Sequence, residues 1–576
     1  MMKFLLSFFM LVLLTCCKPD PTPALPVTQS ITISCNKASY LPGSEVKFEL
    51  SRTFEGICRI RQLGVMIQEI AVSGKSFTWT CSSKDFQGYM AELYTNSSEG
   101  EKLMATIGID VSSSWSKFPR YGFLSDFGNL DQSEMQEVIK FLNRHHINGL
   151  QFYDWQFKHH FPLAGTTQNP LPVWNDIINK PVYFATLESY IDLAHTHRMQ
   201  AMFYNLAFGA LDDAASDGVL PEWYLFSDAQ HTNIDYHPLP KPPFKSDIFL
   251  INPANTGWQQ YLAEKNTGVY QALEFDGFHI DQLGDRGARY DYWGNSVNLP
   301  QAYASFIAAM KTGSPTKELI MNAVNQYGQA DIANSQIEFL YTEVWGPNEN
   351  YSSLAQLIKN NNGYSNNKLS TVLAAYMNYE LANNAGYFNT PGVLLTNAVI
   401  FSHGGAHLEL GEHMLGKEYF PNKNLTMKDD LKKPLMQYYD FLVAYQNLLR
   451  DGGSFNMPEL SSNESRVVLQ NWPPAIGKVA TFGKDFEHCQ VIHLINFTNA
   501  IHLEWRDKLG AQSYPEVINN IEVSFTESKP VKNIWFASPD YLYGAAQVLE
   551  FEQSGNTYTF NLPILQYWSM VVAEYE

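Results

Sequence analysis

The chain has 576 residues, of which 45% are hydrophobic and 17% charged, a composition that excludes a disordered protein and allows roughly two to four domains. A formal net charge of −19 argues against a nucleic-acid partner, because such binding relies on clustered lysine and arginine. Aromatic residues make up 14% of the chain, which suits sugar stacking but also large β-rich cores.

The first residues, 1–17, have the layout of an export signal. One lysine precedes an apolar run from Phe4 to Leu14, and small residues with Cys16 and Cys17 follow. The run is too short to span a membrane, and cysteine at the cleavage boundary resembles a bacterial lipoprotein signal. We therefore predict an exported protein of the bacterial cell envelope, at the outer membrane surface or in the periplasm, with Cys17 favoured over Cys16 as the lipid anchor. Secretion without a lipid stays open.

The next two segments are predicted to be a tether and a small β domain. Residues 18–30 are rich in proline and lack periodicity, as expected of a tether. Residues 31–112 alternate short strand-like segments with Gly, Ser and Asn, which predicts an immunoglobulin-like β-sandwich. An exported protein can oxidise a pair among Cys35, Cys58 and Cys81, but the sequence does not select the partners.

Residues 118–452 alternate strand-like runs with helical periods. Asp131 can cap a helix whose apolar residues recur three and four apart. Eight strand-like runs predict a (β/α)8 TIM barrel, since a doubly wound sheet would use fewer strands. The runs are YGFLSDF, INGLQFYDW, QAMFYNLAFG, GFHIDQLG, LIMNAVN, IEFLYTEVW, TVLAAYMNY and AHLELG. Residues 455–576 return to short β segments and predict a C-terminal β-sandwich, so we expect a multidomain chain with a central barrel between two β-sandwiches.

Two acidic residues stand where catalytic groups lie in such barrels, at the C-terminal ends of strands. GFHIDQLG places Asp281 at the end of the fourth strand, and Gly284 and Gly287 then let the chain turn away. IEFLYTEVWGP places Glu343 at the end of the sixth strand. Carboxylates on next-but-one strands can face each other across the opening, and retaining glycosidases hold theirs about 5 to 5.5 Å apart.

Further polar and aromatic residues near the strand ends could bind the hydroxyls and ring faces of a neutral polyol. A single strand-end acid is more often a rim salt bridge or a helix cap, so the hypothesis depends on the whole set. The candidates are Asp126, Tyr153, Asp154, Trp155, Asn205, Gln282, Asn325, Trp345, Asn378, Glu409 and Glu412.

The histidines suggest no metal site. His403, His407 and His413 match no zinc signature, and no P-loop, GxSxG or strand-borne GxGxxG motif occurs. We therefore expect neither a catalytic metal nor a cofactor, while a structural calcium ion stays open. His159 and His160 are instead candidates for hydrogen bonds to a ligand.

Six motifs in order resemble glycoside hydrolase family 66, which holds endo-dextranases and cycloisomaltooligosaccharide glucanotransferases. They are RYGFLSDF, QFYDWQFKHH, FYNLAFGA, DGFHIDQLG, FLYTEVW and HLELGEHML, between about Arg120 and Leu415. The resemblance implies a retaining mechanism on α-1,6-linked glucan, with Asp281 as nucleophile and Glu343 as acid/base. It also implies that Asp154 holds the sugar at the cleaved subsite.

The chain departs from the family pattern in two ways. Phe157 stands where many members carry tryptophan, so one stacking position differs. The glucanotransferases carry an extra carbohydrate-binding module inserted in the barrel, and no barrel connection here is long enough to hold one. We therefore expect hydrolysis of dextran and isomaltooligosaccharides. A transglycosylase, another α-glycosidase specificity and a non-catalytic surface glycan-binding protein stay open, as do endo or exo preference and oligomeric state.

Overall fold

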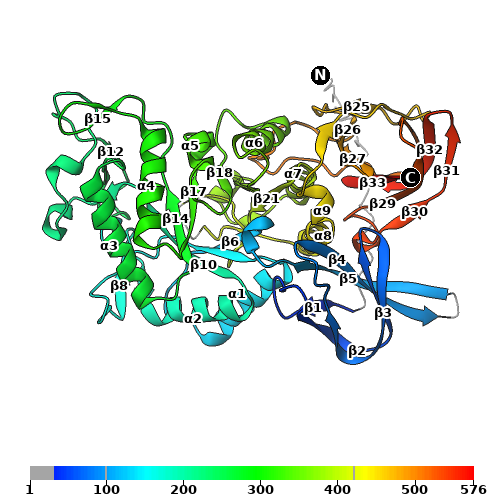
Figure 1. Cartoon of the computed structure of the whole chain (residues 1–576), viewed down its shortest axis with the longest axis horizontal. Helices are drawn as coiled ribbons and strands as arrows, with labels where there is room; N and C mark the ends of the chain where they lie inside the picture. Colours follow the sequence, from blue (N-terminus) through cyan, green and yellow to red (C-terminus); the bar gives the residue numbers. More distant parts are fainter. Residues whose placement is uncertain (1–30, 98–99, 419–421) are drawn as a thin grey trace, which may run out of the picture.

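The computed structural model describes residues 31–97, 100–418 and 422–576. The expected signal peptide with Cys16 and Cys17, and the expected tether, lie outside these residues. In Figure 1 the barrel occupies the centre and left, the N-terminal strands lie below its right-hand end, and the C-terminal strands lie at the right. Within the described part of the chain, no helix is both long and apolar enough to cross a membrane.

The N-terminal strands form one five-stranded antiparallel sheet. Its path is β1-β2-β4-β5, with β3 paired to β2, so a two-sheet immunoglobulin-like sandwich is not confirmed. Cys35, Cys58 and Cys81 are buried free thiols, and no two of them form a disulfide. The strands are β1 Ile33–Cys35, β2 Glu45–Gln62, β3 Val65–Thr80, β4 Gln87–Ser97 and β5 Gly100–Val111.

Eight parallel strands form the barrel, and each overlaps one of the eight predicted runs. Their spatial order is β6-β7-β10-β14-β17-β18-β19-β21, and the Phe123 N–H donates to the Leu410 carbonyl at 3.1 Å where the sheet nearly closes. The strands are β6 Tyr121–Leu124, β7 Gly149–Phe152, β10 Gln200–Leu206, β14 Gly277–Asp281, β17 Glu318–Asn322, β18 Leu340–Glu343, β19 Thr371–Ala374 and β21 Gly405–Leu408.

Helices connect most of the barrel strands. The first begins as expected at Asp131, whose side chain and that of Glu134 form a capping box. The helices are α1 Gln132–Arg144, α2 Phe184–Thr196, α3 Thr256–Ala272, α4 Leu299–Gly313, α5 Gln329–Ala333, α6 Tyr351–Tyr364, α7 Thr390–Ser402, α8 Asp429–Ala444 and α9 Gln446–Leu449. Short 3-10 turns are η1 Trp115–Lys117, η2 Ala214–Asp217, η3 Pro221–Trp223, η4 Val324–Gln326, η5 Leu381–Asn383 and η6 Leu542–Gly544.

Small sheets lie in the connections that follow the barrel strands, at the end of the barrel where such folds carry their sites. The largest has three strands and follows β10. Their strands are β8 Val173–Asn175, β9 Pro181–Tyr183, β11 Gly209–Ala210, β12 Tyr236–His237, β13 Ile248–Leu250, β15 Arg289–Tyr290, β16 Ser296–Val297, β20 Gly386–Tyr387 and β22 Leu425–Thr426.

The C-terminal region is β-rich and consists of a seven-stranded and a four-stranded sheet. Ile492 and Phe536 of one sheet and Val523 and Phe560 of the other belong to one buried core, the arrangement of a β-sandwich. The strands are β23 Ser454–Asn456, β24 Leu460–Ser461, β25 Leu469–Asn471, β26 Val479–Asp485, β27 Cys489–Asn496, β28 Ile518–Thr526, β29 Val531–Ala537, β30 Gln547–Leu549, β31 Phe551–Ser554, β32 Thr557–Leu565 and β33 Trp568–Tyr575.

Candidate active site

Three neighbouring strands end in polar residues at the same edge of the barrel. Asp281 ends β14, Asn322 ends β17 and Glu343 ends β18. The strands are in register, with Ile280 opposite Met321. Side chains alternate along a strand, so Asn322 and Glu343 point into the barrel like Ile320 and Tyr341, which lie two positions earlier, and Asp281 does so on its own strand. Ile280 and Met321 point the other way and pack in the outer core.

The amide of Asn322 holds the two carboxylates at a fixed spacing. Its Nδ2 donates to Asp281 Oδ1 at 2.8 Å and to Glu343 Oε2 at 3.0 Å. The two N–H bonds of a primary amide diverge by about 120°, which places the two accepting oxygens about 5 Å apart. The Glu343 N–H donates to Asn322 Oδ1 at 3.2 Å and fixes the orientation of the amide. This spacing matches the one that retaining glycosidases use.

Each carboxylate also accepts a hydrogen bond from a tyrosine. The Tyr204 hydroxyl donates to Asp281 Oδ2 at 2.7 Å, and the Tyr376 hydroxyl donates to Glu343 Oε1 at 2.7 Å. Sequence reasoning missed Asn322 and both tyrosines. The sequence did hold a signal for them, because each lies an even number of residues from an interior residue of the same run. Tyr204, for example, lies two residues after Met202, so both side chains point into the barrel.

The surroundings give the two acids different proton affinities. Burial raises the pKa of Glu343 to about 7, and the negative charge of Asp281 contributes to this rise, while hydrogen bonds from Tyr376, Asn322 and Trp345 oppose it. Burial also raises the pKa of Asp281, and hydrogen bonds from Asn322 and Tyr204 oppose the rise. The negative charge of Asp281 thus helps to raise the pKa of Glu343, which suits Glu343 as the proton donor and Asp281 as the nucleophile.

Tyr153, Asp154 and Trp345 lie around this pair, as expected. The Tyr153 ring is 4.4 Å from that of Tyr204, centroid to centroid. Burial raises the pKa of Asp154 to about 7, and the charges of Asp176 and Asp281 add to the rise. The Trp345 ring packs on Tyr376 at 5.2 Å. Asp154 also adopts a left-handed backbone with φ of 50°, which is uncommon outside glycine and is frequent at functional sites.

Gln282 and Glu412 are buried or half-buried groups that support neighbouring backbone. The Gln282 N–H bonds to Asp281, and its side-chain oxygen accepts from the Gly284 N–H. Glu412 Oε1 accepts from the Ser125 N–H at 2.8 Å, which joins the end of the last strand to the end of the first. Both contacts stabilise the strand ends.

Asp126 forms the rim ion pair that is the common role of a strand-end acid. Its Oδ2 lies 2.9 Å from Lys423 Nζ. Burial alone would raise the pKa of Asp126, but the hydrogen bond and charge of Lys423 outweigh burial and hold the pKa below its usual value. Lys423 is exposed, so the pair is worth less than about 1 kcal/mol.

Trp155, His159 and Asn205 were expected to bind sugar. In the structure they are buried and support the fold instead. Trp155 is fully buried against Phe203, with its indole N–H donating to the Tyr204 carbonyl at 3.2 Å, so neither ring face is available. His159 Nδ1 lies 2.8 Å from Asn205 Oδ1, and Asn205 Nδ2 donates to the His159 carbonyl at 2.8 Å. The two side chains thus hold each other in place, although the buried His159 Nε2 has no hydrogen-bond partner among the described residues.

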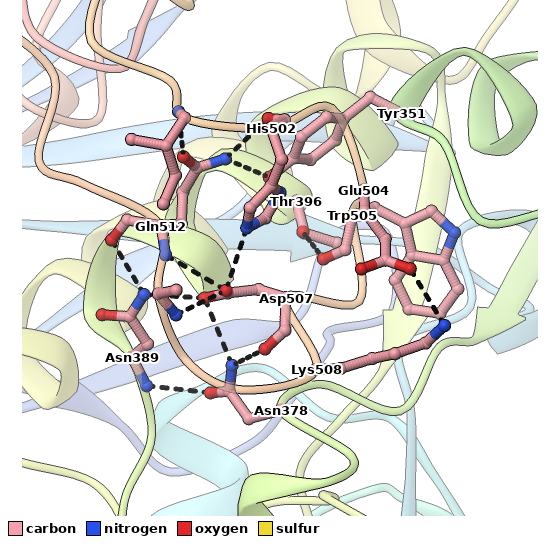
Figure 2. A network of polar contacts seen from close by, with 12 residues as sticks. Tyr351, Asn378, Asn389, Thr396, His502, Glu504, Trp505, Asp507, Lys508 and Gln512 are labelled. Carbon is pink, nitrogen blue, oxygen red and sulfur yellow. Dashed lines mark hydrogen bonds and ion pairs between the residues drawn. The ribbon is translucent and has the colours of Figure 1, made fainter.

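Asn378 and Glu409 are also structural. Asn378 Nδ2 donates to the Asp507 carbonyl at 2.7 Å, in the network of Figure 2. Glu409 is fully buried on the helix side of the barrel, where it accepts from Asn397 Nδ2 at 2.8 Å and from the Tyr439 hydroxyl at 3.0 Å. Burial raises the pKa of Glu409 to about 8. Neither side chain reaches the carboxylate pair.

His160 belongs to the one cluster with metal-ligating atoms that occurs among residues 31–97, 100–418 and 422–576, with Asp213 and Asp217. Leu211 N–H donates to His160 Nδ1, so Nε2 carries the hydrogen that points to Asp217 Oδ2 at 2.9 Å. Lys158 Nζ lies 2.5 Å from Asp213 and 2.7 Å from Asp217. The ammonium already supplies the positive charge that a metal would bring.

The chain is similar to sugar-active proteins over most of its length. The family model described as Glycosyl hydrolase family 66 matches residues 35–572. A cycloisomaltooligosaccharide glucanotransferase of Niallia circulans is 26% identical, over 86% of this chain and 65% of that protein. A dextranase of Streptococcus salivarius is 24% identical, over 84% of this chain and 67% of that protein.

A solved structure shows the same fold. A cycloisomaltooligosaccharide glucanotransferase of Paenibacillus sp., complexed with cycloisomaltoheptaose, superposes with a TM-score of 0.84 at 24% identity, over 94% of this chain and 99% of that chain. The chain spans 65% of the length of the two glucanotransferases from Niallia circulans, which is less than two thirds. Since the family model covers nearly all of the described residues, the chain belongs to glycosyl hydrolase family 66.

Proposed function

We propose that the protein is a glycoside hydrolase that cleaves internal α-1,6-glucosidic linkages of dextran by a retaining double displacement. The observation that carries this proposal is the pair of carboxylates bridged by Asn322, in which the pKa of Glu343 is raised to about 7. The relatives named dextranase and cycloisomaltooligosaccharide glucanotransferase support α-1,6-glucan as the substrate.

In the first step, Asp281 Oδ attacks the anomeric carbon of a glucosyl unit. The bond from this carbon to the glycosidic oxygen breaks, and Glu343 transfers its proton to that oxygen, so the leaving sugar departs as an alcohol. The product is a covalent β-glucosyl ester of Asp281. The hydrogen bonds from Tyr204 and Asn322 hold the carboxylate in place for attack.

In the second step, Glu343 acts as a base. The ester carries no negative charge, so one of the causes that raise the pKa of Glu343 disappears and its carboxylate becomes the stable form. Glu343 then takes a proton from water, whose oxygen bonds to the anomeric carbon while the bond to Asp281 breaks. Two inversions give net retention and return both acids to their starting states.

Side chains beside the acids suit a glucose ring. Asp154, whose carboxylate is within electrostatic reach of Asp281, would accept hydrogen bonds from sugar hydroxyls at the cleaved unit. Tyr153 and Trp345 are half-buried aromatic residues and would pack against the apolar face of a ring. Dextran and isomaltooligosaccharides are the ligands that this arrangement favours.

Hydrolysis is favoured over cyclisation. In the described part of the chain, the additions between barrel strands are no larger than the three-stranded sheet of β11, β12 and β13, so no inserted carbohydrate-binding module is present there. The glucanotransferase relatives keep transglycosylation as the second candidate, because both reactions share the ester of Asp281 and differ in whether water or a sugar takes its place.

One incubation tests the proposal. The full chain is incubated with dextran, and the products are resolved by size and anomeric form; linear isomaltooligosaccharides released with α configuration are expected. Cyclic products would assign the second candidate, and binding without new reducing ends would assign a glycan-binding protein. Asp281→Asn should lower turnover by several orders of magnitude, and near-normal turnover would remove Asp281 as nucleophile.

We also propose that the protein is exported and carries a lipid on Cys17. The supporting observation is the apolar run followed by cysteine at the start of the chain. Metabolic labelling with a radioactive fatty acid should mark the wild type and not Cys17→Ser. Equal labelling of both would exclude Cys17 as the acceptor, and labelling of neither would overturn the assignment of a lipid.

A further inference from the structure

A segment of the C-terminal region packs on two connections of the barrel. This segment, residues 497–512, belongs to the connection between β27 and β28 and lies against the connections that follow β18 and β19 (Figure 2). The Tyr351 N–H donates to the Leu503 carbonyl at 3.0 Å, and the Asn378 N–H donates to the Arg506 carbonyl at 2.8 Å. The first connection begins directly after Glu343, and the second carries Tyr376, so the segment contacts both sides of the proposed acid/base.

Arg506 makes the contacts of this segment that reach furthest toward Glu343. The side chain is buried, with 2% of the residue exposed. Its guanidinium donates to the Val344 carbonyl at 2.7 Å and to the Tyr376 carbonyl at 3.2 Å. Val344 follows Glu343 in the chain, and the Tyr376 hydroxyl donates to Glu343. One side chain therefore joins the backbone of the acid to the backbone of its hydrogen-bond donor.

Aromatic rings surround the same guanidinium. Its central carbon lies 4.9 Å from the ring centroid of Trp345, 5.4 Å from that of Tyr379 and 4.6 Å from that of Trp505. Trp345 is the third hydrogen-bond donor to Glu343. Cation–π attraction at this distance fixes the position of the ring as well as that of the backbone.

The environment of Arg506 favours a positioning role over a simple ion pair. Within the described residues, no carboxylate forms a salt bridge with it. Burial lowers its pKa, while the charges of Glu349 and Glu418 act in the opposite direction. Burying an unpaired guanidinium costs free energy that an apolar side chain of the same volume would not cost. The planar guanidinium, however, has several N–H donors, which an apolar side chain lacks. These donors reach two carbonyls that belong to separate connections.

Asp507 holds the segment in the conformation that presents Arg506. Its Oδ1 accepts from the Ala511 N–H at 2.7 Å and from the Gln512 N–H at 3.1 Å, and its Oδ2 accepts from Asn389 Nδ2 at 2.7 Å (Figure 2). Asp507 is buried and has a left-handed backbone with φ of 44°. The tight turn is thus attached to the barrel, and the direction of the neighbouring Arg506 side chain follows from it.

We propose that Arg506, supplied by the C-terminal region, is a positioning residue for the acid/base: it clamps the Tyr376 backbone and the Trp345 ring so that both side chains contact Glu343. This inference rests on the proposed function, since it acts through the role assigned to Glu343. It predicts that the barrel needs the C-terminal region for acid catalysis as well as for stability.

Arg506→Met in the full chain tests the proposal, because methionine keeps much of the apolar stem and donates no hydrogen bond. We expect kcat on dextran to fall by about tenfold to a hundredfold with little change in KM. The value of kcat/KM on an aryl isomaltoside with a good leaving group should fall much less, because that step needs little acid help. The alkaline limb of the pH profile should move to higher pH, since the Tyr376 hydrogen bond lowers the pKa of Glu343.

Lys508→Ala is the matched control. Lys508 lies in the same segment, and its ammonium pairs with Glu349 at 2.8 Å and Glu504 at 2.9 Å without touching Glu343 or its donors. Wild-type activity and pH profile are expected for this variant. Arg506→Lys should recover part of the lost kcat, because its single ammonium can donate hydrogen bonds but cannot reproduce the planar set of guanidinium donors. If Arg506→Met does not fold, Arg506→Lys is compared with the wild type on the same two substrates.

The outcomes separate this inference from the proposed function. A folded Arg506→Met with wild-type kcat and pH profile overturns the inference and leaves the proposed function standing. Equal losses on dextran and the aryl substrate, with an unchanged pH profile, also overturn it, because they would show a structural role alone. A wild-type protein that does not cleave α-1,6-glucan would instead overturn the proposed function and, with it, the role of Arg506.

Discussion

The bridging amide of Asn322 gives the sharpest test of the site. Its hydrogen bonds to Asp281 and Glu343 stabilise the charged form of each carboxylate, and so lower the pKa of both. Asn322→Ala removes both bonds at once. Activity requires Asp281 ionised and Glu343 protonated, so the acidic limb of the pH profile follows the first pKa and the alkaline limb follows the second. Both limbs should therefore move to higher pH.

The size of the shift follows from the strength of the bonds. Hydrogen bonds to charged groups contribute about 1.5 to 3 kcal/mol each, and the lower value applies because both carboxylates are half-buried and partly solvated. One pKa unit corresponds to about 1.4 kcal/mol. Each limb should thus move by about one pH unit. At the optimum, kcat/KM should fall by about tenfold to a hundredfold, because neither carboxylate is held at its spacing.

The assay is kcat/KM on dextran, measured by release of reducing ends across the pH range. Asn334→Ala is the control: Asn334 is exposed at the end of α5, and its Nδ2 donates to the Ala330 carbonyl at 2.7 Å. It touches neither carboxylate, so its two limbs should stay close to those of the wild type. A profile of Asn322→Ala in which neither limb moves, or only one, would refute the reasoning.

Three further predictions address single residues. Tyr376→Phe keeps the ring but removes the donor to Glu343, so only the alkaline limb of the kcat/KM profile should move to higher pH; a shift of the acidic limb would contradict this. Glu409 has a pKa raised from 4.5 to about 8 in the fold, so its contribution to stability is full below pH 4.5 and is lost as pH rises toward 8. In Glu409→Gln, the melting temperature should therefore fall less steeply as pH rises over that range. An unchanged slope of melting temperature against pH would show that other groups cause the fall. Trp155→Ala should lower the free energy of unfolding by about 3 to 5 kcal/mol with KM unchanged, whereas a raised KM in a stable variant would restore its role in stacking.

The barrel strands could be predicted because buried parallel strands leave a strong pattern in a sequence. Continuous apolar runs of strand length, separated by helical periods, occur eight times, and the structure has one strand in each. A residue at the C-terminal end of a strand is also predicted to lie at the end of the barrel that carries the active site. On this basis Asp281 and Glu343 were expected to face each other across the opening of the barrel, and in the structure both accept a hydrogen bond from Asn322.

The position of a residue along its strand does not by itself show whether its side chain points into the barrel or outward. This explains several wrong assignments of sugar-binding residues. Met202 and Ala406 point into the barrel, so Tyr204 shares that face while Asn205 and Glu409 point to the outer side. Counting in twos from these residues would have excluded Asn205 and Glu409 and found Tyr204. Asn378 could not be excluded in this way, because its partner Asp507 lies 129 residues further along the chain.

The two halves of the site depend on different parts of the protein. Asp281 takes its side-chain donors from Tyr204 and Asn322, which lie within strands of the barrel and are fixed by the register of the sheet. Glu343 shares Asn322, but its other donors, Tyr376 and Trp345, follow the ends of their strands. Loops are held by what packs on them, and here that is the segment from the C-terminal region. Loosening this contact should therefore impair proton transfer before it impairs nucleophilic attack.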